Sequence, residues 1–287
     1  MRIVLGANQY GKAETRVVRV VRDRPRHELH DLNVTTCLAG DLAATHLTGD
    51  NANVLPTDSQ KNTVYAFAKR HGVDQIEDFG LLLARHFVTS QPAITRARVD
   101  IEEYAWQRLG PHSFQRAGGE ARTASVTVDG AETQVVSGLT GLVLLNSTDS
   151  EFAGFVQDEY TTLPPTQDRI LATAVDACWR HADGRAAAGD WAGSYAGVRG
   201  ALVAGFVETY SLSLQQTLYA MGERVLRECP GIVEVRLSLP NKHHLLVDLA
   251  PFGLDNPGEV FVATDRPYGL IEGTVRRDDA PAAEGAR

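Results

Sequence analysis

The chain has 287 residues, of which 43% are hydrophobic and 22% charged, a composition typical of a soluble globular protein with room for two domains. Its formal net charge of −8, without any basic patch, argues against a nucleic-acid partner. No run of about 18 apolar residues is present, so we expect no membrane span, and the apolar part of the N-terminus is too short for a signal peptide.

The first half of the chain contains several strand patterns and one pair of helix patterns. Residues 16–26 interleave arginine with valine, which predicts a strand with a solvated arginine face, and residues 30–38 and 93–101 predict half-buried strands. Two helices are expected at residues 59–71 and 75–90, the second with side chains at helical spacing: Ile76, Phe79, Leu83, His86 and Phe87. Residues 124–128 lead into Asp129-Gly130, a hairpin turn signal, and a strand returns over 135–145.

The second half repeats this order of elements. Strands are predicted at residues 171–179 and 233–239, and helices at 190–210 and 213–228. Each half therefore predicts antiparallel strands, a helix pair and further strands, an α+β fold. The alternating single strands and helices of a parallel sheet are absent.

The repeated order of elements suggests two tandem domains, 1–137 and 138–277, followed by a tail, 278–287, whose composition predicts disorder. Residues 59–66 and 213–220 share Ser, Thr, Tyr and Ala at matching places. The matching helix comes first in its pair in one half and second in the other, so this local match is weaker support than the element order.

Metal and nucleotide sites have no signature in the sequence. The segment His27-Glu28-Leu29-His30 lacks the histidine spacing of a zincin, no Cys-x-x-Cys pair occurs, and neither Gly-rich nucleotide motif is present. We therefore expect no metal and no cofactor. The cysteines are odd in number and widely spaced, which favours reduced thiols in a cytoplasmic protein: Cys37, Cys178 and Cys229.

The segment 238–243, Ser-Leu-Pro-Asn-Lys-His, is the most informative stretch of the chain. Pro240-Asn241 predicts a turn, and residues 243–249 alternate as a strand would. Asn241 and His243 then share one face of the strand, and a polar pair on an apolar face needs partners. A pocket or an interface would supply them, whereas the alternative is a satisfied core histidine.

Two helix starts resemble anion sites. Thr57-Asp58-Ser59-Gln60 follows Pro56 and has the pattern of a capping box, yet a hydroxyl and a carboxylate beside free backbone N–H groups would also suit an anion. Ser213 can cap the later helix and place Leu214 and Gln215 at its first two positions, where N–H groups lack helical acceptors. A planar anion could accept from them, although an ordinary capped helix explains both patterns.

Three further residues have a functional and a structural interpretation. The planar fork of Arg169 suits a carboxylate-like or urea-like edge, unless it pairs with Asp168 or another carboxylate. Phe152 could stack on a flat ring or belong to the core. Lys12 could relay protons near a hydroxyl and a histidine, or could simply be an exposed lysine.

Five motifs occur together and in order: Tyr10-Gly11-Lys12, Thr57-Asp58-Ser59 followed by Lys61-Asn62-Thr63, residues 158–163, Asp168-Arg169-Ile170-Leu171, and residues 238–243. With these motifs the chain resembles the urate oxidase (uricase) family over Tyr10 to Val275. The resemblance implies two tandem tunnelling-fold domains, each an antiparallel sheet with a helix pair on one face. It also implies a homotetramer with active sites at subunit interfaces.

The same resemblance implies a reaction and a site. Urate would be oxidised by O2 and water to 5-hydroxyisourate and hydrogen peroxide without a cofactor, the first step of urate degradation. Phe152 would stack on the purine, Arg169 and Gln215 would grip its edges, and the Leu214 N–H would add a donor. Thr57 and Asp58 would reach in from a neighbouring subunit. Asn241 and Thr57 would hold dioxygen or water, and Lys12, Thr57 and His243 would form a proton relay.

Two other functions stay open at this point. One is a different tunnelling-fold enzyme acting on a purine or pterin, in some cases with a metal bound by His or Cys. The other is a non-catalytic purine-binding or scaffold protein. The sequence ends Glu284-Gly285-Ala286-Arg287 rather than in a peroxisomal Ser-Lys-Leu signal, so we expect a bacterial, cytoplasmic enzyme.

Overall fold

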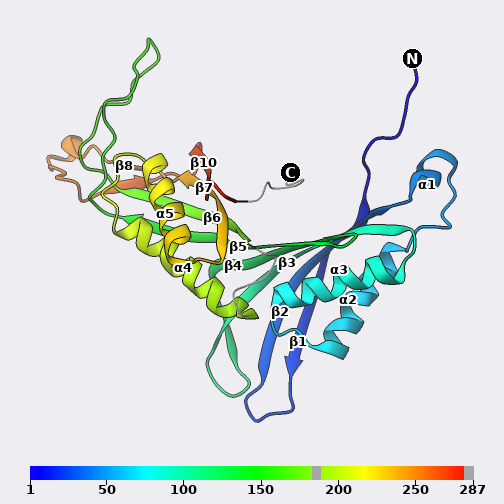
Figure 1. Cartoon of the computed structure of the whole chain (residues 1–287). Coiled ribbons are helices and arrows are strands. Elements are labelled where there is room, and N and C mark those ends of the chain that lie inside the picture. The colour runs from blue at the N-terminus through cyan, green and yellow to red at the C-terminus, as the bar shows by residue number, and fades with distance from the viewer. Residues whose placement is uncertain (183–188, 281–287) are drawn as a thin grey trace. The chain divides into compact units, whose positions relative to one another are not determined.

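The computed structural model describes residues 1–182 and 189–280, and the chain divides into two compact units (Figure 1). Unit 1 comprises Met1–Gly138 with the described part of Asp183–Ala192, and unit 2 comprises Leu139–Ala182 with the described part of Gly193–Arg287. The domain ranges 1–137 and 138–277 stay a prediction, and most of the tail expected to be disordered lies outside the described residues.

Unit 1 is an antiparallel sheet with helices on one face. Its elements are β1 (Tyr10–Val21), β2 (Glu28–Gly40), α1 (Ala43–Thr48), α2 (Thr57–His71), α3 (Ile76–Ser90), β3 (Ile94–Arg108), β4 (Phe114–Asp129) and the first part of β5 (Glu132–Asn146). The strands follow the order β1-β2-β3-β4, each antiparallel to the next. Val64 and Phe87 from the helices are buried against Leu32 and Val34 of β2, because alternate strand residues face the helices.

Unit 2 repeats this arrangement. Its elements after β5 are β6 (Leu171–His181), α4 (Trp191–Val207), α5 (Leu214–Glu228), β7 (Ile232–Asn241), β8 (His244–Leu246), η2 (Ala250–Phe252), β9 (Phe261–Ala263) and β10 (Gly269–Arg276). Strands β6, β7 and β10 are antiparallel neighbours, and β8 and β9 form a separate two-stranded sheet. Leu202 and Phe206 of α4 and Met221 of α5 share one core with Trp179 and Val235.

The predicted α+β fold, with antiparallel strands and a helix pair in each half, is confirmed. All four predicted helices are present, with ends within three residues of those expected. Among the described residues, the short helix α1 and the 3-10 helix η2 were not expected. No helix in the described part of the chain is long and apolar enough to cross a membrane.

Two predictions around residues 240–249 are wrong. Pro240-Asn241 is not a turn but the end of β7, where Asn241 lies opposite Thr173 and Gly269 in the neighbouring strands. A proline is tolerated at a place in a strand where no N–H is needed for pairing. The strand expected over 243–249 is reduced to the three residues of β8, so the chain has a break at Lys242-His243.

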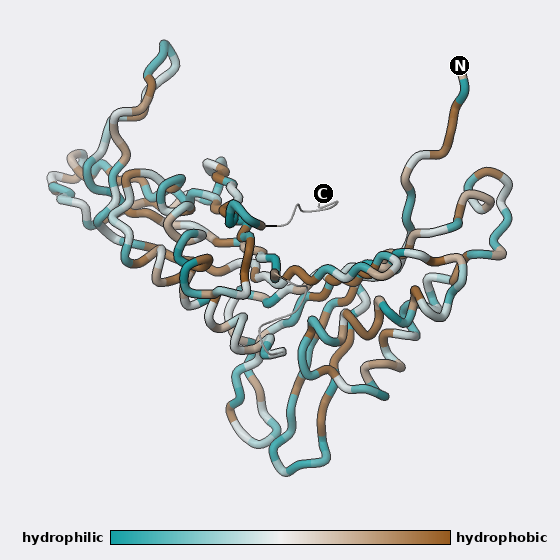
Figure 2. The backbone as a smooth tube through the Cα atoms, viewed as in Figure 1, coloured by the Kyte–Doolittle hydropathy of each residue, from teal (hydrophilic) through white to brown (hydrophobic). Residues whose placement is uncertain are grey.

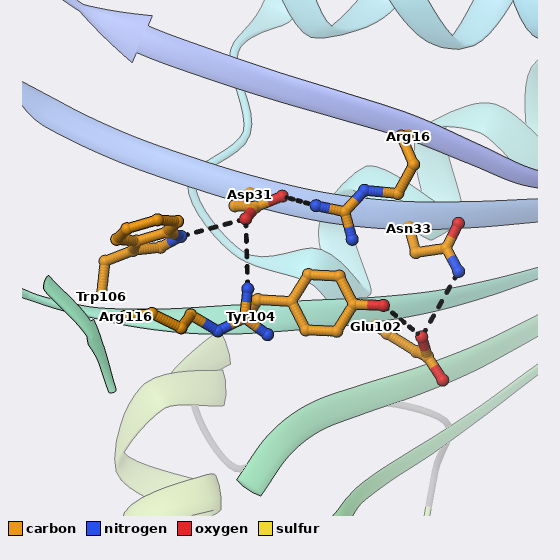
Figure 3. A network of polar contacts seen from close by, with 7 residues as sticks. All are labelled: Arg16, Asp31, Asn33, Glu102, Tyr104, Trp106 and Arg116. Atoms are coloured by element: carbon orange, nitrogen blue, oxygen red, sulfur yellow. Dashed lines mark hydrogen bonds and ion pairs between the residues drawn. The ribbon is translucent and has the colours of Figure 1, made fainter. Parts of the chain in front are cut away.

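The predicted solvated arginine face of the first strand is confirmed for Arg16, whose side chain is 49% exposed, but its guanidinium also forms an ion pair. On the side of the sheet away from the helices, Asp31, which is 4% exposed, pairs with Arg16 and accepts hydrogen bonds from Trp106 Nε1 (3.0 Å) and Arg116 Nη1 (3.3 Å) (Figure 3). Both guanidinium groups lie within 4.4 Å of the Tyr104 ring centroid. Of the remaining arginines of the basic run, Arg19 lies in β1, and Arg22, Arg24 and Arg26 lie in the link between β1 and β2, which is largely hydrophilic (Figure 2).

Candidate functional site

Unit 2 contains a cavity of about 670 Å³. This volume lies within the range of about 300–1,000 Å³ that is usual for small-molecule sites. It is formed by the loop after β5, the start of α5, the end of β7 and the β8–β9 hairpin. Six of the residues singled out in the sequence line it: Phe152, Arg169, Leu214, Gln215, Asn241 and His243.

Arg169 brings a positive charge to this cavity and forms no ion pair with the described residues, although Asp168 also lines the cavity. Its Nε atom is buried and has no hydrogen-bond partner, and no carboxylate of the described residues pairs with its guanidinium. The alternative pairing with Asp168 is wrong, because no ion pair joins the two side chains; the Asp168 carboxylate instead accepts a hydrogen bond from Thr148 Oγ1 at 2.9 Å. Burial lowers the pKa of Arg169 below its usual value, and an anionic ligand would offset this cost of desolvation.

Phe152 places a flat ring next to that cation. Its ring stacks on Phe155 with centroids 4.8 Å apart and an interplanar angle of 12°, and the Arg169 guanidinium carbon lies 5.4 Å from its centroid. A pair of backbone hydrogen bonds with Thr166 (2.9 and 3.0 Å) holds the residue in place. Phe152 is half-buried at the cavity rather than in the core, so a ligand ring could stack on it.

The start of α5 forms another part of the cavity lining. Ser213 caps the helix by accepting a hydrogen bond from the Gln216 N–H (3.2 Å), as predicted, and the Gln216 side chain accepts from the Leu212 N–H (2.7 Å). Leu214 and Gln215 are therefore the first two helical residues, whose N–H groups lack acceptors within the helix. An anion is favoured at this end of the helix.

Asn241 and His243 reach the cavity from the end of β7 and the link that follows it. A hydrogen bond from the Lys242 N–H to Ala172 O (2.8 Å) fixes the link, and His243 O accepts from the Thr264 N–H (2.8 Å). The His243 ring is half-buried and has no hydrogen-bond partner among the described residues. The alternative of a satisfied core histidine is therefore wrong.

Unit 1 holds the remaining predicted residues, Lys12, Thr57 and Asp58. Lys12 lies in β1, and its N–H donates to Thr36 Oγ1 at 3.4 Å. The Thr36 hydroxyl in turn donates to Gln60 Oε1 at 2.8 Å, which ties the first turn of α2 to β2. Gln60, which is fully buried, is thus a cross-link between helix and sheet.

The predicted capping box at residues 57–60 is wrong. The helix is preceded by Pro56, which provides no side-chain cap, and Thr57 is the first helical residue. Gln60 faces the sheet, and its Nε2 donates to Leu55 O at 3.3 Å. The Thr57 hydroxyl makes no hydrogen bond with the described residues, so the helix does not require it.

Asp58 is exposed at the same helix start. It pairs with Lys61 and accepts a hydrogen bond from Asn62 Nδ2 at 3.1 Å. The hydrogen bond and charge of Lys61 lower the pKa of Asp58, and the charge of Lys12 contributes in the same direction. Lys12 and Asp58 therefore lie close enough within unit 1 to interact electrostatically.

Several cavity residues were not singled out in the sequence. His244 lines the cavity beside His243, with its Nδ1 3.1 Å from Lys242 O, and Ile271 lines it from β10. The only signal for them was their position within or beside the motifs. No group of three or more His, Cys, Asp or Glu side chains is placed to hold a metal ion within residues 1–182 and 189–280.

The fold is that of a tunnelling-fold protein, and its unit 2 holds a cavity lined by a cation, an aromatic ring and the start of a helix. A family model described as Uricase matches residues 8–127 and 135–272. A uricase from Arthrobacter globiformis is 52% identical over 98% of this chain and 92% of its own, and one from Aspergillus flavus is 38% identical over 94% and 96%. The chain belongs to the uricase family and is an enzyme of the urate oxidase class.

Solved structures agree with this assignment. The crystal structure of uricase from Arthrobacter globiformis superposes with a TM-score of 0.95 at 52% identity, covering 99% of this chain and 98% of that chain. A urate oxidase mutant from Bacillus sp. TB-90 superposes with a TM-score of 0.79 at 26% identity, covering 96% of this chain and 100% of that chain. The similarity therefore extends over both units.

Proposed function

We propose that this chain oxidises urate with O2 and water to 5-hydroxyisourate and hydrogen peroxide without a cofactor, as the first step of urate degradation. Membership of the uricase family supports urate as the substrate. The observation that carries the proposal is Arg169, a partly buried cation that forms no ion pair with the described residues, next to the ring of Phe152. A flat anion such as urate supplies both the charge and the stacking surface that this arrangement lacks.

Four contacts would hold the substrate. Phe152 stacks on the purine ring, Arg169 and Gln215 grip opposite edges, and the Leu214 N–H adds a donor at the start of α5. Arg169 offers two parallel donors to one edge of the ring. The Gln215 amide offers both a donor and an acceptor to the other. Together these groups fix the plane of the ring and leave one face open to the oxidant.

The chemistry needs electron transfer and proton transfer. Ground-state O2 is a triplet and reacts poorly with closed-shell molecules, but an electron-rich urate anion can donate one electron to it, and the radicals then combine. The product gains one oxygen from water, and O2 leaves as hydrogen peroxide. The protein therefore has to take protons from urate and keep O2 and water over one face of the ring.

Lys12, Thr57 and His243 would form the proton relay, and Asn241 and Thr57 would hold dioxygen or water. The free Thr57 hydroxyl supports this proposal because α2 does not use it as a cap. The His243 ring supports it as well, since no described residue occupies its nitrogens. Asp58 would assist in binding the substrate from the same helix start as Thr57.

A homotetramer would bring these two groups of residues together. Unit 1 carries Lys12, Thr57 and Asp58, whereas unit 2 carries the cavity. We propose that unit 1 of one subunit meets the cavity of a neighbouring subunit at their interface. A cytoplasmic location stays a prediction.

One assay tests the proposed function. The purified chain should remove the ultraviolet absorbance of urate and release hydrogen peroxide in metal-free buffer, with the same rate after treatment with a chelator. Loss of activity with the chelator would instead favour the alternative of a metal-dependent tunnelling-fold enzyme. Urate binding without turnover would favour the alternative of a binding protein.

A further inference from the structure

A buried bridge in unit 2 joins the backbone of Arg169 to the start of α5. The Arg169 N–H donates to Ser150 O at 2.9 Å. Ser150 pairs with Ser211 in a parallel β-bridge, which the hydrogen bond from the Glu151 N–H to Ser211 O (2.8 Å) supports. Two segments that are about 60 residues apart in the sequence are thus held side by side behind the cavity.

Hydroxyl groups complete this bridge. Ser211 Oγ donates to Ser213 O at 3.1 Å and accepts from Thr217 Oγ1 at 2.8 Å. Thr217 Oγ1 also lies 3.2 Å from Ser213 O. Ser213 is the cap of α5, and the cavity residues Leu214 and Gln215 follow it directly. The bridge therefore connects the backbones of Arg169 and Gln215, both of which line the cavity.

Three residues of the bridge are fully buried, and Ser150 takes part through its backbone because its hydroxyl has no hydrogen-bond partner. Ser150, Ser211 and Thr217 are all 0% exposed. Burying a hydroxyl costs free energy that its hydrogen bonds only just offset, and apolar side chains of similar size would fill the same space without that cost. What hydrogen bonds provide instead is a defined distance and direction between the segments that they join.

We propose that Ser211 and Thr217 are positioning residues, which set the distance between Arg169 and Gln215 and so match the clamp to a ligand of the size of urate. This inference rests on the proposed function, because it assigns both side chains to the same ligand. Neither hydroxyl touches the ligand. They act through the backbone of residues 211–215 and through the segment that holds Arg169.

A matched pair of variants at Thr217 separates positioning from packing. Thr217→Val keeps the shape of the side chain and removes its hydroxyl, whereas Thr217→Ser keeps the hydroxyl and removes a methyl group. We expect Thr217→Val to raise the urate Kd, measured without O2, by about tenfold or more, because hydrogen bonds between the clamp and the ligand weaken steeply when their geometry is lost. Thr217→Ser should bind urate nearly as the unaltered chain does.

Steady-state kinetics provide a second measurement, in which the changes in KM and kcat are compared. Since the relay residues are unchanged in Thr217→Val, KM should rise by a larger factor than kcat falls. Val225→Ala is the control, because Val225 is fully buried on the same helix but outside the bridge. This variant should melt at a lower temperature and bind urate with unchanged Kd.

The inference is overturned if Thr217→Val binds urate as tightly as the unaltered chain, or if Thr217→Ser is as weak as Thr217→Val. Should Thr217→Val fail to fold, Ser211→Ala replaces it, with the same expected rise in Kd and the same contrary outcome. An unaltered chain that neither binds nor oxidises urate would contradict the proposed function itself. The unaltered chain alone gives that result, so a failure of the proposed function can be distinguished from a failure of this inference.

Discussion

Arg169 shows how a single residue can indicate a ligand. Its side chain is partly buried, its Nε lacks a hydrogen-bond partner, and it forms no ion pair with a carboxylate of the described residues. Such a charge destabilises the ligand-free protein because desolvation is not offset. An anion bound next to Arg169 would offset this cost, and the offset would contribute to its binding affinity.

Arg169→Met should therefore separate stability from binding. Methionine keeps the apolar stem and removes the charge, so the ligand-free variant should melt no lower than the unaltered chain. Its affinity for urate should fall by about 2–5 kcal/mol, as expected when one partner of a buried charged contact is removed. Thermal melting with and without urate measures both effects, and an unaltered urate Kd would count against the clamp.

Thr57 permits a similar test at the start of α2. The helix is not capped by its hydroxyl, so Thr57→Val should leave the melting temperature nearly unchanged. If the hydroxyl relays protons, kcat should fall by about 100-fold or more, the usual contribution of a positioned acid or base. Thr57→Ser, which keeps the hydroxyl, should retain most of the activity, and a Thr57→Val enzyme with normal kcat would refute the relay.

Helix α3 has a pH-sensitive contact with α2. His86 packs against Phe67 and Phe87, with ring centroids 4.6 and 5.7 Å apart. Burial and, to a smaller degree, the charge of Arg70 lower the pKa of His86. The unfolded chain then binds the proton more tightly than the folded one, so protonation favours unfolding.

The sign of this effect can be tested. As pH falls below about 6.5, the ordinary histidine pKa, unfolded His86 gains its proton first and the free energy of unfolding should decrease. It should recover as pH rises through the same range. The free energy of unfolding, measured with urea between pH 5 and 7.5, should depend less steeply on pH in His86→Leu than in the unaltered chain. An identical slope of this free energy against pH would exclude His86 as a contributor.

The division of the proposed site between units has a consequence for the whole molecule. If each active site combines unit 1 of one subunit with unit 2 of another, Thr57→Ala and Arg169→Ala damage different halves of the site. Co-expression of the two inactive variants should restore activity, since about a quarter of the sites in randomly mixed oligomers would be intact. Mixtures as inactive as either variant alone would contradict a shared site.

Much of the fold could be predicted from local patterns. The helices at Thr57–His71, Ile76–Ser90 and Leu214–Glu228 were expected within two residues, because apolar side chains at helical spacing face one core. Predictions failed where tertiary contacts outweigh a local pattern. Gln60 matches a capping box but is buried against β2, and Pro240 matches a turn but continues β7.

The sequence by itself determined the order of strands and helices, the cap at Ser213 and the motifs that identify the uricase family, because these depend on residues close together in the chain. Only the tertiary structure decided that Phe152, Arg169, Gln215 and His243 line one cavity. It also decided that Arg169 has no carboxylate partner among the described residues and that backbone and hydroxyl hydrogen bonds link its segment to α5. Contacts between segments about 60 or more residues apart depend on how the elements pack, which periodicity does not specify.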